Sequence, residues 1–270
     1  MAVTGLSVLA ASPAAAAATV SGFAQCANGS TGVTCTGWVN GSLGTSNSHF
    51  AEDQVVPQRA LISLPADNLE HSLTFTYQDR KGSIHSYDSL ATWNKTVSGA
   101  DPCQGLAAAL CAASPSHLNM TSDPAANVPP ATGGSSPAVS AHELAQADRQ
   151  WTMYGGALTT DVAATHSSPA SGDDLVTVTV KFRNATPGTA TTGVLLFGGH
   201  LAVGGPSTAP RAWGANLGAT SVSGGPYAFK LEAVDGSSTG ATSNTIQASG
   251  VAPLPPAVFT VTKSASSATA

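Results

Sequence analysis

Residues 174–183 read DLVTVTVKFR, and apolar and polar side chains alternate along this stretch. The apolar positions are Val176, Val178, Val180 and Phe182. Strict alternation is typical of a β-strand that buries one face, and Val, Thr and Phe favour strands. Residues 71–79 (HSLTFTYQD) and 227–236 (YAFKLEAVDG) alternate in the same way. The sequence therefore predicts an all-β protein, an antiparallel β-sandwich of the immunoglobulin-like or jelly-roll-like kind.

The composition is poor in charge. Charged residues make up 9% of the 270 residues and hydrophobic residues 42%, with a formal net charge of -5. Because ten Lys and Arg stand against fifteen Asp and Glu, no extended basic face can form, and we expect no nucleic-acid partner. The net charge is also too small to keep the chain disordered. Strands rich in Thr and Val between Gly and Pro indicate a secreted protein.

Two short segments are typical of helices within this β framework. In residues 86–94 (SYDSLATWN), Tyr87, Leu90 and Trp93 are spaced to share one face of a helix. Residues 140–151 (SAHELAQADRQW) open with the capping-box pattern of Ser140 and Glu143. The sandwich is therefore expected to carry one or two short helices.

The beginning of the sequence indicates export. Residues 1–20 join a short apolar run to small residues suited to cleavage near Ala16 or Ala18, as in a signal peptide. The basic start of a signal peptide is missing, since the first basic residue is Arg59, and Met1 is interpreted as a late start. The apolar run is too short to span a bilayer. We expect a secreted or cell-surface protein that does not span the membrane.

The rest of the chain divides by composition. Residues 21–252 form the predicted sandwich, and a segment near 122–140, rich in Pro, Gly and Ser, separates either two domains or two halves of one sandwich. Residues 253–270 are interpreted as a linker and the first strand of a following domain.

The four cysteines fall into two close pairs, Cys26 with Cys35 and Cys103 with Cys111. Short loops lose little entropy on closure, and export permits disulfides, so these two local disulfides are predicted. A zinc site is the alternative, although it prefers tighter spacing and additional histidines.

Several motifs occur in a fixed order between residues 33 and 235. They are GWVNGSL (37–43), VVPQRALISL (55–64), SYDSLATWN (86–94), ADPC (100–103) and FGGHLA (197–202). In this order they resemble an uncharacterised group of large secreted bacterial surface proteins. The end of the chain, with VTKSA at 261–265, resembles the first strand of the immunoglobulin-like repeats found in tandem on bacterial surface proteins. The resemblance implies an exported, multidomain surface protein and carries over no catalytic residues.

One group of polar residues could form a catalytic site. His85 and Asp88 are three residues apart, and His200 follows two glycines that permit close backbone approach. Should the fold bring them together, a base and its orienting group would be present, as in a hydrolase. The alternative is that His85 ends a hairpin and His200 is a hydrogen-bonded strand residue.

Two further places could bind a ligand. Trp213 lies in a stretch rich in Gly and Pro, and with Arg211 beside it could stack on a sugar. Asp173 and Asp174 offer paired carboxylates that could bind calcium or form a solvated turn, and no other cofactor is expected.

Two catalytic motifs are incomplete. HELAQ at 142–146 begins like the zinc-protease motif but has Gln146 where the second histidine belongs. GSSTG at 236–240 matches the esterase string without a helical pattern after it. Neither string predicts an enzyme.

These observations favour a non-enzymatic extracellular module, structural or adhesive, within a larger bacterial surface protein. Other surface proteins or glycans are the expected partners. A glycan- or calcium-dependent binding module is the first alternative, and a hydrolase with a His/Asp site is the second.

Overall fold

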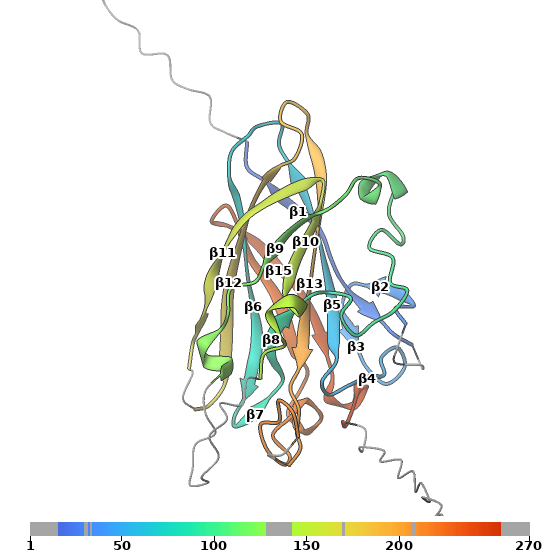
Figure 1. Cartoon of the computed structure of the whole chain (residues 1–270), viewed down its shortest axis with the longest axis vertical. Helices are drawn as coiled ribbons and strands as arrows, with labels where there is room; N and C mark the ends of the chain where they lie inside the picture. Colours follow the sequence, from blue (N-terminus) through green and yellow to red (C-terminus); the bar gives the residue numbers. More distant parts are fainter. Residues whose placement is uncertain are drawn as a thin grey trace, which may run out of the picture.

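Two β-sheets pack together to form the protein. The computed structural model describes residues 16–29, 32, 34–127, 142–168, 171–206 and 209–254. In this part the two main sheets are arranged as a sandwich (Figure 1). Most strand pairs are antiparallel, and two short pairs, β15 with β3 and β16 with β4, are parallel. The predicted all-β sandwich is confirmed at this level.

The first sheet has a central path of six strands and one side strand. In spatial order it contains β2 (Gly37–Val39), β1 (Thr19–Ala27), β5 (Val55–Leu64), β13 (Thr191–Leu201), β10 (Gln150–Tyr154) and β9 (Ser116–Asn119), with β8 (Tyr87–Ala91) paired to β13.

The second sheet has the same number of strands. In spatial order it contains β11 (Gly156–His166), β12 (Asp174–Asn184), β6 (His71–Lys81), β14 (Tyr227–Val234), β15 (Ser237–Ile246) and β3 (Ser42–Leu43), with β7 (Ile84–His85) paired to β6. A separate small pair is β16 (Val251–Ala252) with β4 (Phe50–Ala51).

Strands from both halves of the sequence build each sheet. In the first sheet β5 pairs with β13, and in the second sheet β6 lies between β12 and β14. Residues 128–141, which include most of the predicted boundary segment, lie outside the described residues, as do residues 1–15 of the predicted leader and 255–270 of the predicted tail. The predictions for those segments stay predictions.

The core lies between the two sheets and follows the alternation in the sequence. The apolar positions of β12 and β6 are buried: Leu73, Phe75, Tyr77, Val176, Val178, Val180 and Phe182. At the centre, the Phe75 ring stacks on Phe197 with centroids 4.7 Å apart and meets Trp151 edge-on at 5.9 Å. Aromatic pairs of this kind add about 0.5–1.5 kcal/mol beyond their buried area.

The predicted helices are wrong. Residues 87–91 form strand β8, because both of its faces are covered: Tyr87 packs on Phe229 in the core, and Asp88 faces a buried polar cluster. Residues 146–148 form only a 3-10 turn, and Ser140 of the expected capping box lies outside the described residues. In the described ranges the helical segments are all 3-10 turns: Ala108–Cys111, Pro124–Asn127, Gln146–Asp148, Ala219–Ser221 and Ala248–Gly250.

Both predicted disulfides are confirmed. Cys26 is bonded to Cys35 with 5.7 Å between their Cα atoms, and Cys103 to Cys111 with 6.0 Å. Since all four sulfurs are paired, the alternative of a cysteine zinc site is wrong. The disulfides are consistent with an oxidising environment such as the cell exterior. The 3-10 turns of the described residues are far too short to carry the chain across a membrane, and no helix there qualifies.

The described chain enters and leaves at opposite ends of the sandwich. Thr19, at the start of β1, pairs with Ser63 near the end of β5. Strands β4 and β16 lie beyond the other end of β5, whose ten residues span about 33 Å. In Figure 1, β16 accordingly lies at the lower end and the start of β1 at the upper end.

Candidate functional site

Three sequence candidates, His85, Asp88 and His200, come together at the lower end of the sandwich. Nδ1 of His200, on β13, lies 2.6 Å from Oδ1 of Asp88, on β8. His85, on β7, joins through the ring of Trp213, which also contacts Asp88. The glycine before His200 is required by packing, since a Cβ on Gly199 would lie 2.5 Å from the Phe229 ring. We call the group of Asp53, His85, Asp88, His142, His200, Arg211 and Trp213 the His200 cluster.

Both ring nitrogens of His200 are bonded to carboxylates. In addition to Asp88, Oδ1 of Asp53 lies 3.1 Å from Nε2. Burial alone would lower the pKa of His200, but the charge of Asp88 and the hydrogen bonds to both carboxylates raise it to about 9. The ring is therefore an imidazolium at neutral pH and donates from both nitrogens. A general base needs a nitrogen that can accept a proton, and in this arrangement His200 offers none.

The hydroxyl of Ser89, beside Asp88, does not complete a hydrolase triad with His200. Ser89 is buried, and its hydroxyl donates to Oδ1 of Asp88 over 3.4 Å. A serine nucleophile is instead activated by a hydrogen bond to the imidazole, with the carboxylate on the far side of the ring. The geometry thus lacks the contact that such chemistry requires.

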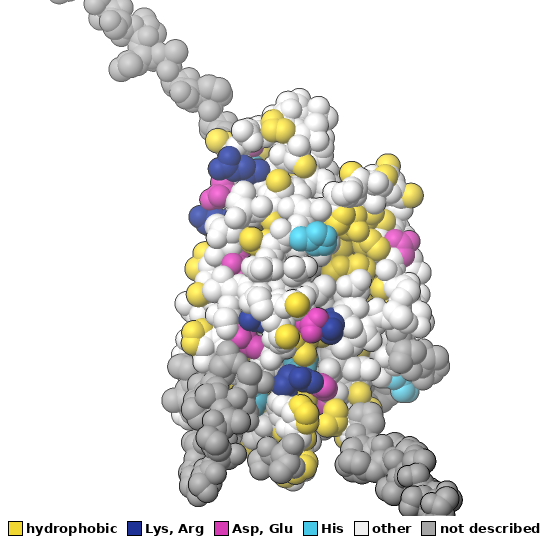
Figure 2. Space-filling view, in the orientation of Figure 1, with side chains coloured by type: hydrophobic (Ala, Val, Ile, Leu, Met, Phe, Trp, Pro, Cys, Tyr) yellow, Lys and Arg dark blue, Asp and Glu magenta, His cyan; other side chains and the backbone are white. Residues whose placement is uncertain are grey.

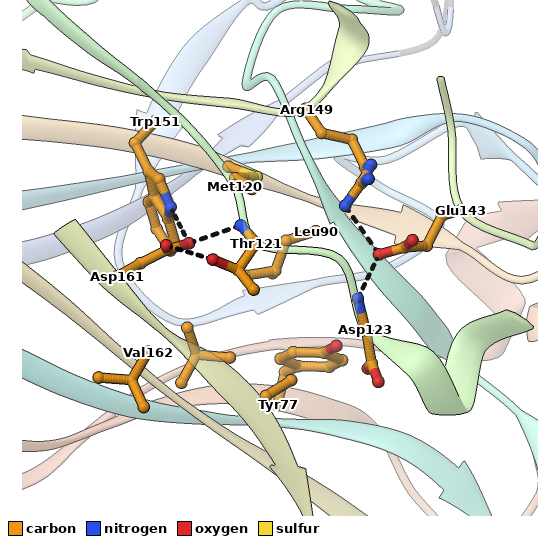
Figure 3. A pocket seen from close by; sticks show the side chains of 12 residues that line it. Tyr77, Leu90, Met120, Thr121, Asp123, Glu143, Arg149, Trp151, Asp161 and Val162 are labelled. Carbon is orange, nitrogen blue, oxygen red and sulfur yellow. Dashed lines mark hydrogen bonds and ion pairs between the residues drawn. The ribbon is translucent and has the colours of Figure 1, made fainter. Parts of the chain in front are cut away.

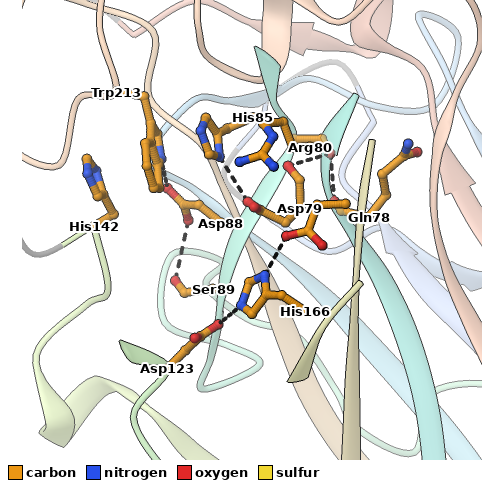
Figure 4. Close-up of polar contacts among 12 residues, drawn as sticks. Gln78, Asp79, Arg80, His85, Asp88, Ser89, Asp123, His142, His166 and Trp213 are labelled. Carbon is orange, nitrogen blue, oxygen red and sulfur yellow. Dashed lines mark hydrogen bonds and ion pairs between the residues drawn. The ribbon is translucent and has the colours of Figure 1, made fainter. Parts of the chain in front are cut away.

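Trp213 lies between two imidazole rings (Figure 4). The ring centroids of His85 and His142 are each 3.5 Å from that of the indole, and the planes are nearly parallel. The indole N–H donates to Oδ2 of Asp88 at 2.9 Å. Because both faces of the indole are covered, a sugar could stack on Trp213 only after one imidazole had moved.

Arg211 is also committed to a partner within the cluster. Its Nε and Nη2 donate to the two oxygens of Asp53, each over 2.7 Å. Both residues have left-handed backbones, with φ of 59° and 68°, a conformation that costs of order 1–3 kcal/mol for residues other than glycine. Burial raises the pKa of Asp53, but hydrogen bonds to His200 and Arg211 outweigh it and lower the value to about 2. The ion pair offsets the backbone strain.

The two candidate calcium ligands have different partners. The exposed Asp173 accepts a hydrogen bond from the backbone N–H of Gly82 at 2.7 Å. The buried Asp174 accepts from the backbone N–H of Ser168 at 2.8 Å, and its other oxygen lies 2.5 Å from Nδ1 of His166. Asp174 therefore belongs to a second buried group, with His166.

A small cavity lies beside Asp123, which bonds to His166 (Figure 3). It has a volume of about 20 Å³ and is lined by Tyr77, Asp123, Glu143, Arg149 and Trp151, among others. That is room for about one water molecule and too little for a sugar or a peptide. On the face seen in Figure 2, cationic and anionic side chains lie next to each other in small groups and form no patch of one sign.

Sequence reasoning missed several members of these groups. Asp53, Asp123 and His166 lie on turns or strand ends with no motif around them. The glycines before His200 were the one local signal. The incomplete HELAQ motif does contain a cluster residue, His142, but its ring stacks on Trp213 and bonds to the carbonyl of Arg211 at 2.8 Å. The GSSTG string spans the β14–β15 turn and the start of β15.

No protein-family model, curated protein or solved structure matches this chain.

Proposed function

We propose that this chain is a non-enzymatic structural module of an extracellular protein, a rigid spacer that transmits force along its long axis. The observation that carries the proposal is the placement of the two ends of the described chain at opposite ends of the sandwich (Figure 1). The resemblance of the sequence to secreted bacterial surface proteins supports the same role.

The direction of the terminal strands adds support. β1 begins at the upper end, where the N–H of Ala18 donates to Asp235 at 3.1 Å, and runs downward beside β5. β15 also runs downward, from the turn at Asp235 to Ile246. Tension between the two ends would load the hydrogen bonds of both strands in shear, so that many must break together.

The His200 cluster fits this role better than it fits catalysis. Its ion pairs hold the loop between β13 and β14 against β8 and the turn before β5, because Arg211 and Trp213 of the loop bind Asp53 and Asp88. The same two aspartates also bond to both ring nitrogens of His200, which leaves neither nitrogen free. The cluster therefore closes the lower end of the sandwich.

Single-molecule force spectroscopy tests the proposal. The chain is pulled between residue 19 and residue 252, and as a control between residue 19 and residue 238, which both lie at the upper end. The first geometry shears strands and the second peels β15 away from β14. We expect a several-fold higher unfolding force in the first geometry. Equal forces in the two geometries would contradict the spacer function.

A further inference from the structure

A second buried group of ionisable side chains has no role in the proposed spacer. It consists of Asp79, Asp123, His166 and Asp174, and we call it the His166 cluster (Figure 4). One ligand atom from each of Asp79, His166 and Asp174 lies within 4.8 Å of those of the other two. These residues come from β6, the end of β11 and the start of β12, three neighbouring strands of one sheet.

We infer that Asp79, His166 and Asp174 form a binding site for one Zn²⁺ ion. Zinc binds imidazole nitrogen and carboxylate oxygen at about 2.0–2.2 Å, so donor atoms a few ångströms apart can converge on it with small side-chain adjustments. Calcium takes six to eight oxygen ligands, and the imidazole in this group therefore selects against it. A water molecule would be the fourth ligand of the tetrahedral zinc site.

The orientation of His166 is that of a metal ligand. Its Nε2 lies 2.9 Å from Oδ2 of Asp123, so Nε2–H donates to that carboxylate. Nδ1 faces the other two carboxylates, and in the metal-free chain its proton lies toward Oδ2 of Asp174. Histidines that bind metals almost always donate their other nitrogen to a carboxylate, carbonyl or water. Asp123 is itself held, since its Oδ1 accepts the N–H of Ala125 at 2.9 Å.

Asp174 presents a single oxygen to the site. Its Oδ1 accepts from the backbone N–H of Ser168 at 2.8 Å and from the hydroxyl of Ser167 at 3.1 Å. Its Oδ2 remains for the site and lies 2.5 Å from Nδ1 of His166. A Zn²⁺ ion would take the place of the proton between these two atoms, and that proton would go to solvent.

The charge around Asp79 also favours a cation. One carboxylate oxygen of Asp79 lies within 4.8 Å of one of Asp174, and both side chains are buried. The Arg80 guanidinium nearby donates to the carbonyls of Gly172 and Ser168. A divalent ion between Asp79 and Asp174 would relieve the repulsion between the two carboxylates.

The chain contains its own control. His71 also lies between two carboxylates, Asp67 and Asp235. Across the described ranges, however, Asp79, His166 and Asp174 form the one group of three His, Cys, Asp or Glu ligands close enough to hold a metal. A histidine between two carboxylates is therefore not enough, and the third ligand distinguishes the site.

The experiment is calorimetric titration of Zn²⁺ into the full chain, disulfides intact and metal removed by chelator, with Co²⁺ absorption as a second readout. We expect one Zn²⁺ per chain and no Ca²⁺ uptake. D79N and H166Q should abolish binding, and D123N should weaken it about 10–100-fold. H71Q should bind as the wild type does. Circular dichroism checks that each variant is folded.

The outcomes separate clearly. Absence of Zn²⁺ uptake by the wild type at millimolar concentration, or equal uptake by D79N and the wild type, would overturn the site. So would Ca²⁺ binding in place of Zn²⁺. Should H166Q fail to fold, D79N decides, since an asparagine at this position still accepts the hydrogen bond from His85. None of these results bears on the spacer function.

Discussion

His200 and His71 lie at opposite ends of the sandwich and have the same kind of partners in different surroundings. Each imidazole lies between two aspartates. His71 bonds to Asp235 at 2.8 Å and to Asp67 at 3.1 Å. Both imidazoles are buried, and Asp235, Asp67 and Asp53 are 23%, 25% and 28% exposed, whereas Asp88 is fully buried.

The difference shows that burial decides what such a contact does. At His71 water can solvate either aspartate when the imidazole is removed, because both aspartates are partly exposed. At His200 no water replaces the imidazole, and Asp88 would keep an uncompensated buried charge. Removing one partner of a buried ion pair costs far more than removing one partner of an exposed pair.

The largest expected effect is that of H200Q. Glutamine is uncharged and leaves the Asp88 carboxylate buried without its cation, so the free energy of unfolding should fall by about 3–5 kcal/mol. Urea denaturation followed by tryptophan fluorescence measures it. The double variant D88N/H200Q should be less destabilised than the sum of the two single variants, and strict additivity would show that the two groups do not depend on each other.

The pH dependence of stability tests the charge of His200. Since the pKa of His200 is about 9 in the folded protein against an ordinary 6.5, its contribution is complete below pH 6.5 and is lost as pH rises through about 9. In the metal-free protein the pKa of His166, about 9, and the raised pKa of His71 act in the same direction. H200Q should therefore flatten this decline in part. A wild-type stability that rises from pH 6.5 to 9 would be incompatible with these protonation states.

W213F tests the hydrogen bond within the buried cluster. Phenylalanine keeps a ring between His85 and His142 but removes the N–H that donates to Asp88. A lost bond to a buried charged acceptor costs about 1–3 kcal/mol. Thermal unfolding monitored by circular dichroism gives the change, with W38F as the matched control, whose indole bonds to the carbonyl of Asp101 instead. The bond to Asp88 matters little if W213F is as stable as W38F.

The smallest effect is expected for the contacts of His71 with Asp67 and Asp235. H71Q should lower the free energy of unfolding by about 1 kcal/mol or less, because both aspartates remain in contact with water. Salt should reduce the difference further. The same urea titration with and without added salt measures it, and a loss equal to that of H200Q would remove the distinction between the two ends.

The strands could be predicted where one face is buried. Alternation in residues 71–79 and 174–183 reports burial directly, and β6 and β12 follow it. β8 could not be predicted in this way, because both of its faces are covered and its apolar spacing imitates a helix. An Asn-Gly pair is typical of a hairpin turn, but Asn40–Gly41 joins β2 of one sheet to β3 of the other and forms no hairpin.

The site could be predicted only in its residue types. His85, Asp88 and His200 were identifiable as polar residues in an apolar context. Their pairing was not, because His200 and Asp53 are 147 residues apart and no local pattern links a turn residue to a distant strand. Long-range ion pairs depend on the register of the whole sandwich.

The protonation state of His200 tests the central claim that its cluster closes the fold and does not catalyse. Nitrogen-15 NMR of the imidazole at pH 7, with H200Q for assignment, measures it directly. We predict an imidazolium with both nitrogens protonated and a pKa of about 9. A neutral ring with one unprotonated nitrogen and a pKa at or below 6.5 would contradict the account, since that ring could serve as a base.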